Sequence, residues 1–118
     1  MATYDISGEI VNTNLNLIHD LLQEKLEGVK LRLKNQEELF IENEDIYLNI
    51  YEYQQEKDGN SYLLGGAIDG SITFTKDVLN KIAQLLTINE IKYNFEFSEE
   101  STAGDNLGKE YSIKHPDF

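Results

Sequence analysis

The chain has 118 residues, which is enough for one domain with a single hydrophobic core. It contains no cysteine, which excludes a disulfide framework and any thiolate metal site. Its formal net charge is −12, from 22 acidic and 10 basic residues. Direct binding to nucleic-acid phosphates or to an anionic membrane is therefore disfavoured, whereas a basic protein partner is compatible with the charge. Net charge also keeps a protein soluble, so the acidity has a simpler explanation as well.

Targeting signals are not evident in the sequence. No apolar run approaches the roughly 20 residues that a membrane span needs. The first residues, MATYDISGEIV, lack the basic start and the long apolar region of a secretory signal. We therefore expect a cytoplasmic protein.

The first quarter of the chain predicts a strand followed by a helix. Residues 3–11 alternate loosely between apolar and polar positions, as a half-buried strand does. Three short polar residues at 12–14 are good helix caps, and apolar residues then recur at helical spacing. This stripe consists of Leu15, Ile18, Leu22 and Leu26, with Leu21 beside it. Gly28 follows where helices commonly end in a left-handed residue.

The middle of the chain predicts four strands, at residues 29–34, 39–42, 45–54 and 61–68. In the first of them, aliphatic residues alternate with Lys30, Arg32 and Lys34, which indicates a half-buried strand with a basic outer face. A Lys-Asp-Gly-Asn turn at 57–60 leads into the last of them. That strand contains Gly65 and Gly66, which indicate a bulge, a bend or a group packed against bare backbone.

The last part of the chain predicts a second helix and two more strands. Thr75 is the expected helix cap, and Asp77 in the first turn suits the positive end of the helix dipole. The buried face of this helix consists of Val78, Leu79, Ile82, Leu85 and Leu86. An alternating strand with Tyr93, Phe95 and Phe97 follows. A polar loop at 99–108 then leads to a short strand with Tyr111 and Ile113, which Pro116 stops.

These elements predict a single α+β domain over residues 1–118, in the order β-α-β-β-β-β-α-β-β. Each helix has one apolar stripe and each strand one apolar face, so the economical packing places both helices on one face of a single, mostly antiparallel sheet of about six or seven strands. The units at 3–33 and 62–97 resemble one another weakly. This resemblance is compatible with an internal β-α-β-β duplication, and chance similarity explains it equally well.

Catalytic motifs are not found. The chain has no cysteine nucleophile and no Gly-x-Ser-x-Gly elbow, and the glycine-rich stretch at 64–70 lacks both the dinucleotide spacing and the P-loop lysine. His19 lies beside Asp20 and near Glu24, but no further metal ligands can be placed, so a solvated helix face explains it best. His115 lies in a C-terminal tail. We expect no enzyme activity, no cofactor and no metal.

The strand at 45–54 has the most unusual surroundings. Ile46, Leu48 and Ile50 alternate with tyrosines, and eight acidic residues lie between Glu37 and Asp58, with only Lys57 opposing them. Tyrosine is enriched at protein interfaces because it combines a large rigid ring with a polar tip. The candidate binding residues are Glu42, Glu44, Asp45, Tyr47, Tyr51, Glu52, Tyr53, Glu56 and Asp58.

The composition favours a non-enzymatic acidic binding module, an inhibitor or immunity-type protein that masks a basic partner such as a nuclease toxin. Two other functions stay open: a self-associating structural protein with a dimer interface on the tyrosine face, and a small enzyme or ligand-binding domain with a pocket near Gly65, Gly66 and His19. A plainer explanation of the candidate surface also stays open. The acids can be loop solubilisers, the tyrosines can cover a second layer, and the basic strand can pair with some of the acids.

Overall fold

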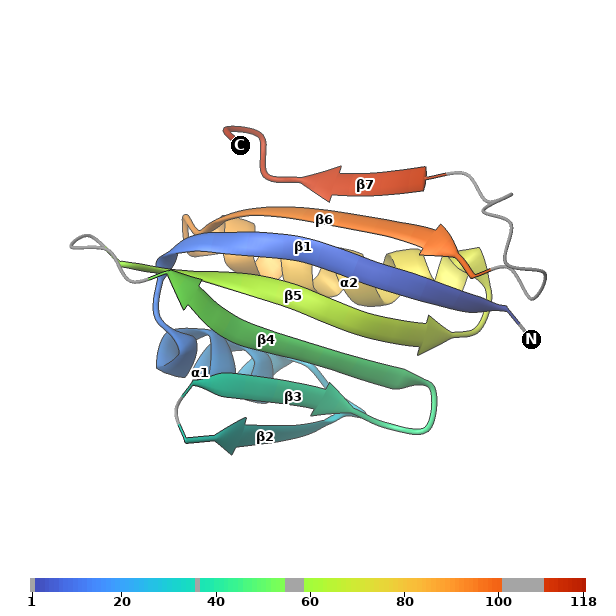
Figure 1. Cartoon of the computed structure of the whole chain (residues 1–118), viewed down its shortest axis with the longest axis horizontal. Helices are drawn as coiled ribbons and strands as arrows, with labels where there is room; N and C mark the ends of the chain where they lie inside the picture. The colour runs from blue at the N-terminus through green and yellow to red at the C-terminus, as the bar shows by residue number, and fades with distance from the viewer. Residues whose placement is uncertain (1, 36, 55–58, 101–109) are drawn as a thin grey trace.

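The computed structural model describes residues 2–35, 37–54, 59–100 and 110–118. Its elements are β1 (Thr3–Thr13), α1 (Leu15–Lys25), β2 (Lys30–Lys34), β3 (Glu38–Glu42), β4 (Ile46–Gln54), β5 (Asn60–Asp69), α2 (Ile72–Ile88), β6 (Lys92–Glu99) and β7 (Glu110–Lys114). The strands form one antiparallel sheet in the order β2-β3-β4-β5-β1-β6-β7 (Figure 1). The α+β prediction, its element order and its single sheet are confirmed. No helix among the described residues has the length and apolar composition of a membrane span.

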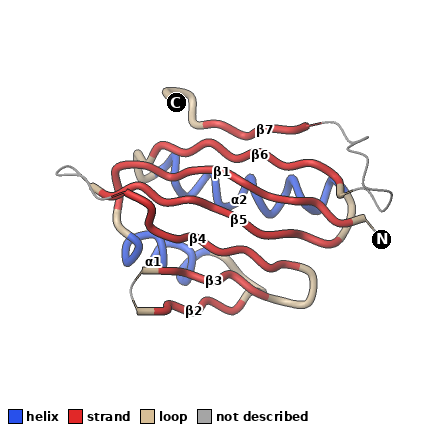
Figure 2. The backbone as a smooth tube through the Cα atoms, in the orientation of Figure 1, coloured by secondary structure: helices blue, strands red, loops and turns tan. Residues whose placement is uncertain are grey.

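Both helices lie on the same face of the sheet. Figures 1 and 2 show α1 behind β3 and β4 and α2 behind the central strands β5, β1 and β6. The two longest strands, β1 and β5, pair with each other at the centre. The packing that the sequence predicted is therefore confirmed.

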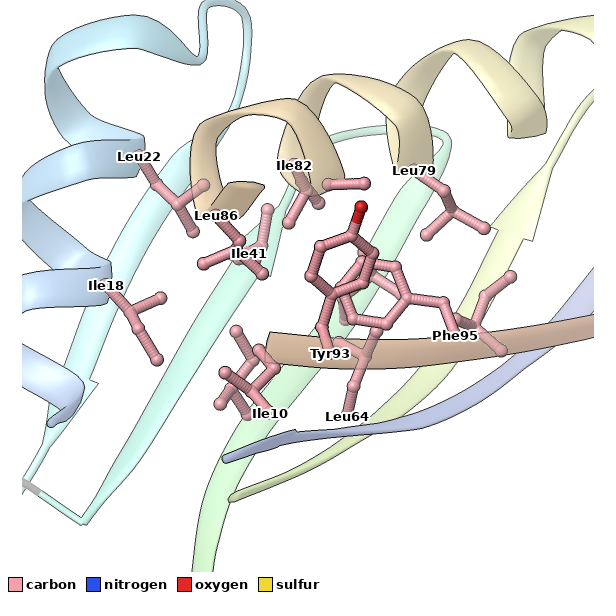
Figure 3. Close-up of a cluster of buried hydrophobic side chains, with 14 of the residues drawn as sticks. Ile10, Ile18, Leu22, Ile41, Leu64, Leu79, Ile82, Leu86, Tyr93 and Phe95 are labelled. Atoms are coloured by element: carbon pink, nitrogen blue, oxygen red, sulfur yellow. The ribbon is translucent and has the colours of Figure 1, made fainter. Parts of the chain in front are cut away.

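The core fills the space between the helices and the sheet. On β4, Ile46, Leu48 and Ile50 are buried, and their side chains belong to one cluster with residues from both helices. Figure 3 shows Ile18 and Leu22 of α1 close to the apolar side chains of the strands. The α2 residues in this cluster are Val78, Leu79, Ile82, Ala83 and Leu86. Burial of this kind stabilises the fold by about 1.5–3 kcal/mol for each large aliphatic side chain.

The start of α2 differs from the prediction. Ser71 is the N-cap, and its side chain accepts a hydrogen bond from the backbone N–H of Phe74 at 3.0 Å. Thr75 was expected to cap this helix, but it lies inside the first turn, fully buried, with its hydroxyl donating to the Ser71 carbonyl at 3.0 Å. Ser and Thr are both common N-caps, and here the end of β5 at Asp69 decides which of them stands at the helix start.

The two glycines of β5 have different surroundings. The register of β5 with both neighbours is unbroken at Gly65 and Gly66, so there is no bulge there. Gly66 has a φ of +127°, and a Cβ at this position would collide with the carbonyl oxygen of Tyr47. The close approach of another backbone, one of the three predicted explanations, is what the structure shows.

The two strand–helix–strand units place their strands differently. After α2 the next strand, β6, pairs directly with β1 near the centre of the sheet, whereas after α1 the next strand, β2, lies at the sheet edge. The first residue after β7, His115, lies against β6, because its backbone N–H donates to the Tyr93 carbonyl and its ring meets the Tyr93 ring edge-on. The chain then turns away from β6 to its C-terminus (Figure 1). The first two residues of the predicted turn at 57–60 and most of the predicted loop, at 101–108, lie outside the described residues.

Candidate functional site: the open face of the sheet

The face of the sheet opposite the helices is here called the open face. Strand register places side chains from all seven strands on it in three rows, each running from β2 to β7. The first row is Lys30, Glu42, Tyr47, Ala67, Asp5, Ser98 and Glu110. The second row is Arg32, Phe40, Asn49, Gly65, Ser7, Glu96 and Ser112, and the third is Lys34, Glu38, Tyr51, Leu63, Glu9, Asn94 and Lys114. Both helices lie on the other side (Figure 1), so no described helix covers these rows.

The tyrosine patch, defined as Tyr47, Tyr51 and Tyr53, contains the large exposed aromatic side chains of β4. These side chains are 54%, 39% and 45% exposed. The Tyr47 ring packs at a tilt against Phe40, with 6.3 Å between the ring centroids. The hydroxyl of Tyr53 donates to Glu9 at 3.3 Å, across β5. Of the plainer explanations, a second layer over the tyrosines is therefore not present among the described residues.

The predicted acidic residues are divided between several places. Glu42 lies on the open face beside Tyr47, and Glu44 and Asp45 are exposed in the β3–β4 turn. The Asn43 side chain closes this turn by accepting hydrogen bonds from two backbone N–H groups, those of Asp45 and Ile46. The turn therefore presents its two carboxylates at one end of the tyrosine patch.

One of the other candidate acids, Glu52, does not join the tyrosines. Glu52 is opposite Tyr62 in the β4–β5 register, and the Tyr62 hydroxyl reaches α1, so Glu52 lies on the helix side. Its carboxylate accepts a hydrogen bond from the Asn60 side chain at 2.5 Å. Glu56 and Asp58 lie outside the described residues. The sequence could have excluded Glu52 from the tyrosine face. It lies at an even-numbered position of β4, as the buried Ile46 and Ile50 do, and alternate residues of a strand face the same side.

The basic strand β2 borders the acids of β3. The Arg32 guanidinium is 2.9 Å from the Glu42 carboxylate and 4.1 Å from the centre of the Phe40 ring, so one side chain makes an ion pair and a cation–π contact. Lys30 and Lys34 stand opposite Glu42 and Glu38 in the register. The basic strand therefore pairs with one of the acids, through Arg32 and Glu42, as the plainer explanation expected. This side of the open face carries both positive and negative charges.

Sequence reasoning missed the carboxylates on the other side of the tyrosine patch. Asp5, Glu96 and Glu110, with Ser7 and Ser98, line a shallow hollow of about 140 Å³ between β1, β6 and β7. These acids are far apart in the chain, and only the pairing of β6 with both β1 and β7 brings them together. No group of three or more His, Asp or Glu side chains in the described part of the chain is arranged to hold a metal ion.

The helix side offers a different kind of site. An open cavity of about 400 Å³ lies between α2 and β7, lined mainly by apolar groups that include Ala83, Ile88 and Ile113. Its lining contains neither His19 nor the glycines of β5, where the sequence suggested a pocket. The His19 ring is 3.1 Å from the carboxylate of its neighbour Asp20.

Comparison with protein families, with curated proteins and with solved structures finds no match for this chain.

Proposed function

We propose that the protein is a non-enzymatic binding module, of the inhibitor or immunity type, that docks a basic protein partner on the open face of its sheet. The observation that carries the proposal is the exposure of the tyrosine patch on a face that no described helix covers. Large exposed aromatic rings are costly to leave in water and form the buried anchors of protein interfaces. A small domain has little reason to keep three of them on one strand unless a partner covers them.

The charges around the patch support a basic partner. Glu44 and Asp45 lie at one end of it, and Glu9 reaches Tyr53 at the other end. The hollow lined by Asp5, Glu96 and Glu110 accepts the end of a lysine or arginine side chain. A net charge of −12 also speeds the encounter with a protein of opposite sign.

The basic strand β2 restricts which part of the open face a basic partner can cover. The cations Lys30, Arg32 and Lys34 repel a basic surface, and Glu42 is already occupied by Arg32. A basic partner therefore covers β4, β5 and β1 and extends towards β6, and it avoids β2. Its apolar residues meet the tyrosine patch, while its cations meet the carboxylates around it.

The experiment is an affinity capture from the native host with three matched baits. The baits are the wild-type chain, an open-face variant with Tyr47→Ser and Tyr51→Ser, and a helix-side control with Leu17→Ser and Ile88→Ser, whose target residues are also exposed apolar side chains. We expect the wild type and the control to retain one and the same basic protein, identified by mass spectrometry. The open-face variant does not retain this protein. Raising the salt from about 0.05 M to about 0.5 M releases it from the wild type, because salt screening reduces the range of charge–charge interactions.

Two results contradict the proposal. One is that no basic protein is retained at low salt by the wild-type bait. The other is that the captured protein stays bound to the open-face variant as well as to the wild type, which would place the contact elsewhere.

A further inference from the structure

The sheet has two edges with different charge patterns. β2 and β7 are the outermost strands in the described sheet, and an edge strand has unpaired backbone groups that can pair with another chain. A two-fold pairing of β2 with β2 of a second copy, centred on Arg32, places Arg32 against Arg32 and Lys30 against Lys34. Like charges directly opposite one another are destabilising, so β2 blocks its own pairing.

One hydrogen bond shows which residues of β7 direct their backbone N–H and C=O groups towards β6 and which direct them outward. The N–H of His115 donates to the carbonyl of Tyr93 at 3.0 Å, in continuation of the β6–β7 register. In an antiparallel strand, alternate residues direct their backbone groups to opposite sides. The backbone groups of Tyr111 and Ile113 therefore face β6, and those of Glu110, Ser112 and Lys114 face outward.

The three residues with outward backbone groups form a self-complementary sequence. When β7 pairs with β7 of a second copy around an axis at Ser112, Ser112 meets Ser112, and Glu110 of each copy meets Lys114 of the other. All three pairs are of the hydrogen-bonded kind, which gives roughly six backbone hydrogen bonds. Both charge pairs have opposite sign, the reverse of the situation at β2.

The helix side of β7 also gains from this pairing. Tyr111 and Ile113 are only partly buried, and Ile113 borders the apolar cavity beside α2. In the two-fold pairing, Tyr111 of one copy lies opposite Ile113 of the other, so each apolar side chain gains a neighbour. The same cavity is flanked by Ile88, which is 77% exposed.

We propose that two copies of this chain associate through antiparallel pairing of their β7 strands, with Ser112 on the two-fold axis. The two sheets then form one continuous sheet. The axis is perpendicular to that sheet, so both open faces, with their tyrosine patches, lie on the same side of the dimer. This contact shares Glu110 with the hollow proposed for the basic partner and otherwise lies apart from that surface. It stands whether or not that partner exists.

The first test is the mass in solution of the wild type and of Ser112→Pro, by sedimentation equilibrium up to about 1 mM chain. The measurement uses about 0.15 M salt, which screens the repulsion between two acidic copies beyond ~8 Å. Proline removes an outward N–H and no bond to β6, so the monomer fold tolerates it at this edge. We expect the wild type to approach twice the 13.6 kDa mass of the chain. Ser112→Pro stays a monomer.

The second test reverses the charge pairs and does not depend on proline. Glu110→Lys alone and Lys114→Glu alone each turn two attractive pairs into two repulsive ones, and we expect each to weaken association about tenfold. The double variant with both changes restores the opposite charges and recovers wild-type association. Lys92→Glu, the same charge change on β6, is the control and leaves association unchanged.

Three results overturn the proposal. The first is a wild-type mass of 13.6 kDa at every concentration. The second is a dimer that neither Ser112→Pro nor the single charge reversals weaken. The third is a dimer that is lost in the variant with Tyr47→Ser and Tyr51→Ser and retained in Ser112→Pro, because the open face would then be the contact.

Discussion

The phenolic oxygen of Tyr62, on the central strand β5, accepts a hydrogen bond from the backbone N–H of Leu15 at 3.0 Å. Leu15 is the first residue of α1, so this N–H has no partner within the helix. Tyr62 and Leu15 are both buried. One side chain therefore fixes the start of α1 to the sheet.

Replacing Tyr62 by Phe removes this bond and leaves a buried N–H without a partner. We expect Tyr62→Phe to lower the free energy of unfolding by about 1–3 kcal/mol. Urea denaturation measures the change. Tyr47→Phe is the control, because Tyr47 is exposed and its loss of a hydroxyl changes stability by less than about 0.5 kcal/mol. Equal stability of the two variants would contradict the structural role of Tyr62.

The neighbouring glycines of β5 predict responses to alanine of very different size. Gly66 has a φ of +127° and no room for a Cβ, so Gly66→Ala should lower the free energy of unfolding by more than about 2 kcal/mol. At Gly65 an added Cβ meets only the end of the Asn49 side chain, at 3.3 Å, and this amide can move. We expect Gly65→Ala to change stability by less than about 1 kcal/mol. Thermal unfolding of the two variants tests the contrast, which a similar loss in both would refute.

The cap of α2 predicts a difference between two hydroxyl residues near its start. Ser71→Ala removes the acceptor for the Phe74 N–H and should cost about 1 kcal/mol. Thr73, two residues later, is exposed, and Thr73→Ala should be close to neutral. Chemical denaturation of both variants measures the difference. A larger loss in Thr73→Ala than in Ser71→Ala would mean that the helix begins elsewhere.

The phenol of Tyr4 predicts a pH dependence of stability. Burial raises its pKa above the ordinary value of 10.0, and the charges of Glu99 and Tyr111 raise it further. A pKa that is raised on folding gives stability that is complete below the unfolded pKa and is lost as pH rises through the folded pKa. Above about pH 10 the wild type should therefore lose stability faster than Tyr4→Phe. Denaturation series from pH 8 to 11 on both chains test this, and parallel curves would exclude it.

Local patterns in the sequence predicted most of the fold. The spacing of Leu15, Ile18 and Leu22 predicted α1. Strict alternation predicted that Ile46, Leu48 and Ile50 are buried and that the tyrosines at the odd-numbered positions of β4 are not. These predictions succeed because the period of apolar residues depends on local geometry, 3.6 residues in a helix and 2 in a strand. The cap of α2 was missed because Ser71 and Thr75 both fit the local rule, and the end of the preceding strand chose between them.

Which strands are neighbours was decided by the tertiary structure. The sequence alone determined the element order, the buried face of each strand and an exposed tyrosine stripe, because side-chain period specifies a face. It did not determine that β1 lies between β5 and β6, that Arg32 reaches Glu42, or that Asp5, Glu96 and Glu110 gather at one hollow. Strand pairing joins residues far apart in the chain, and no local period encodes the choice of neighbour. The same pairing makes β7 an outermost strand of the described sheet, where we propose that it meets a second copy.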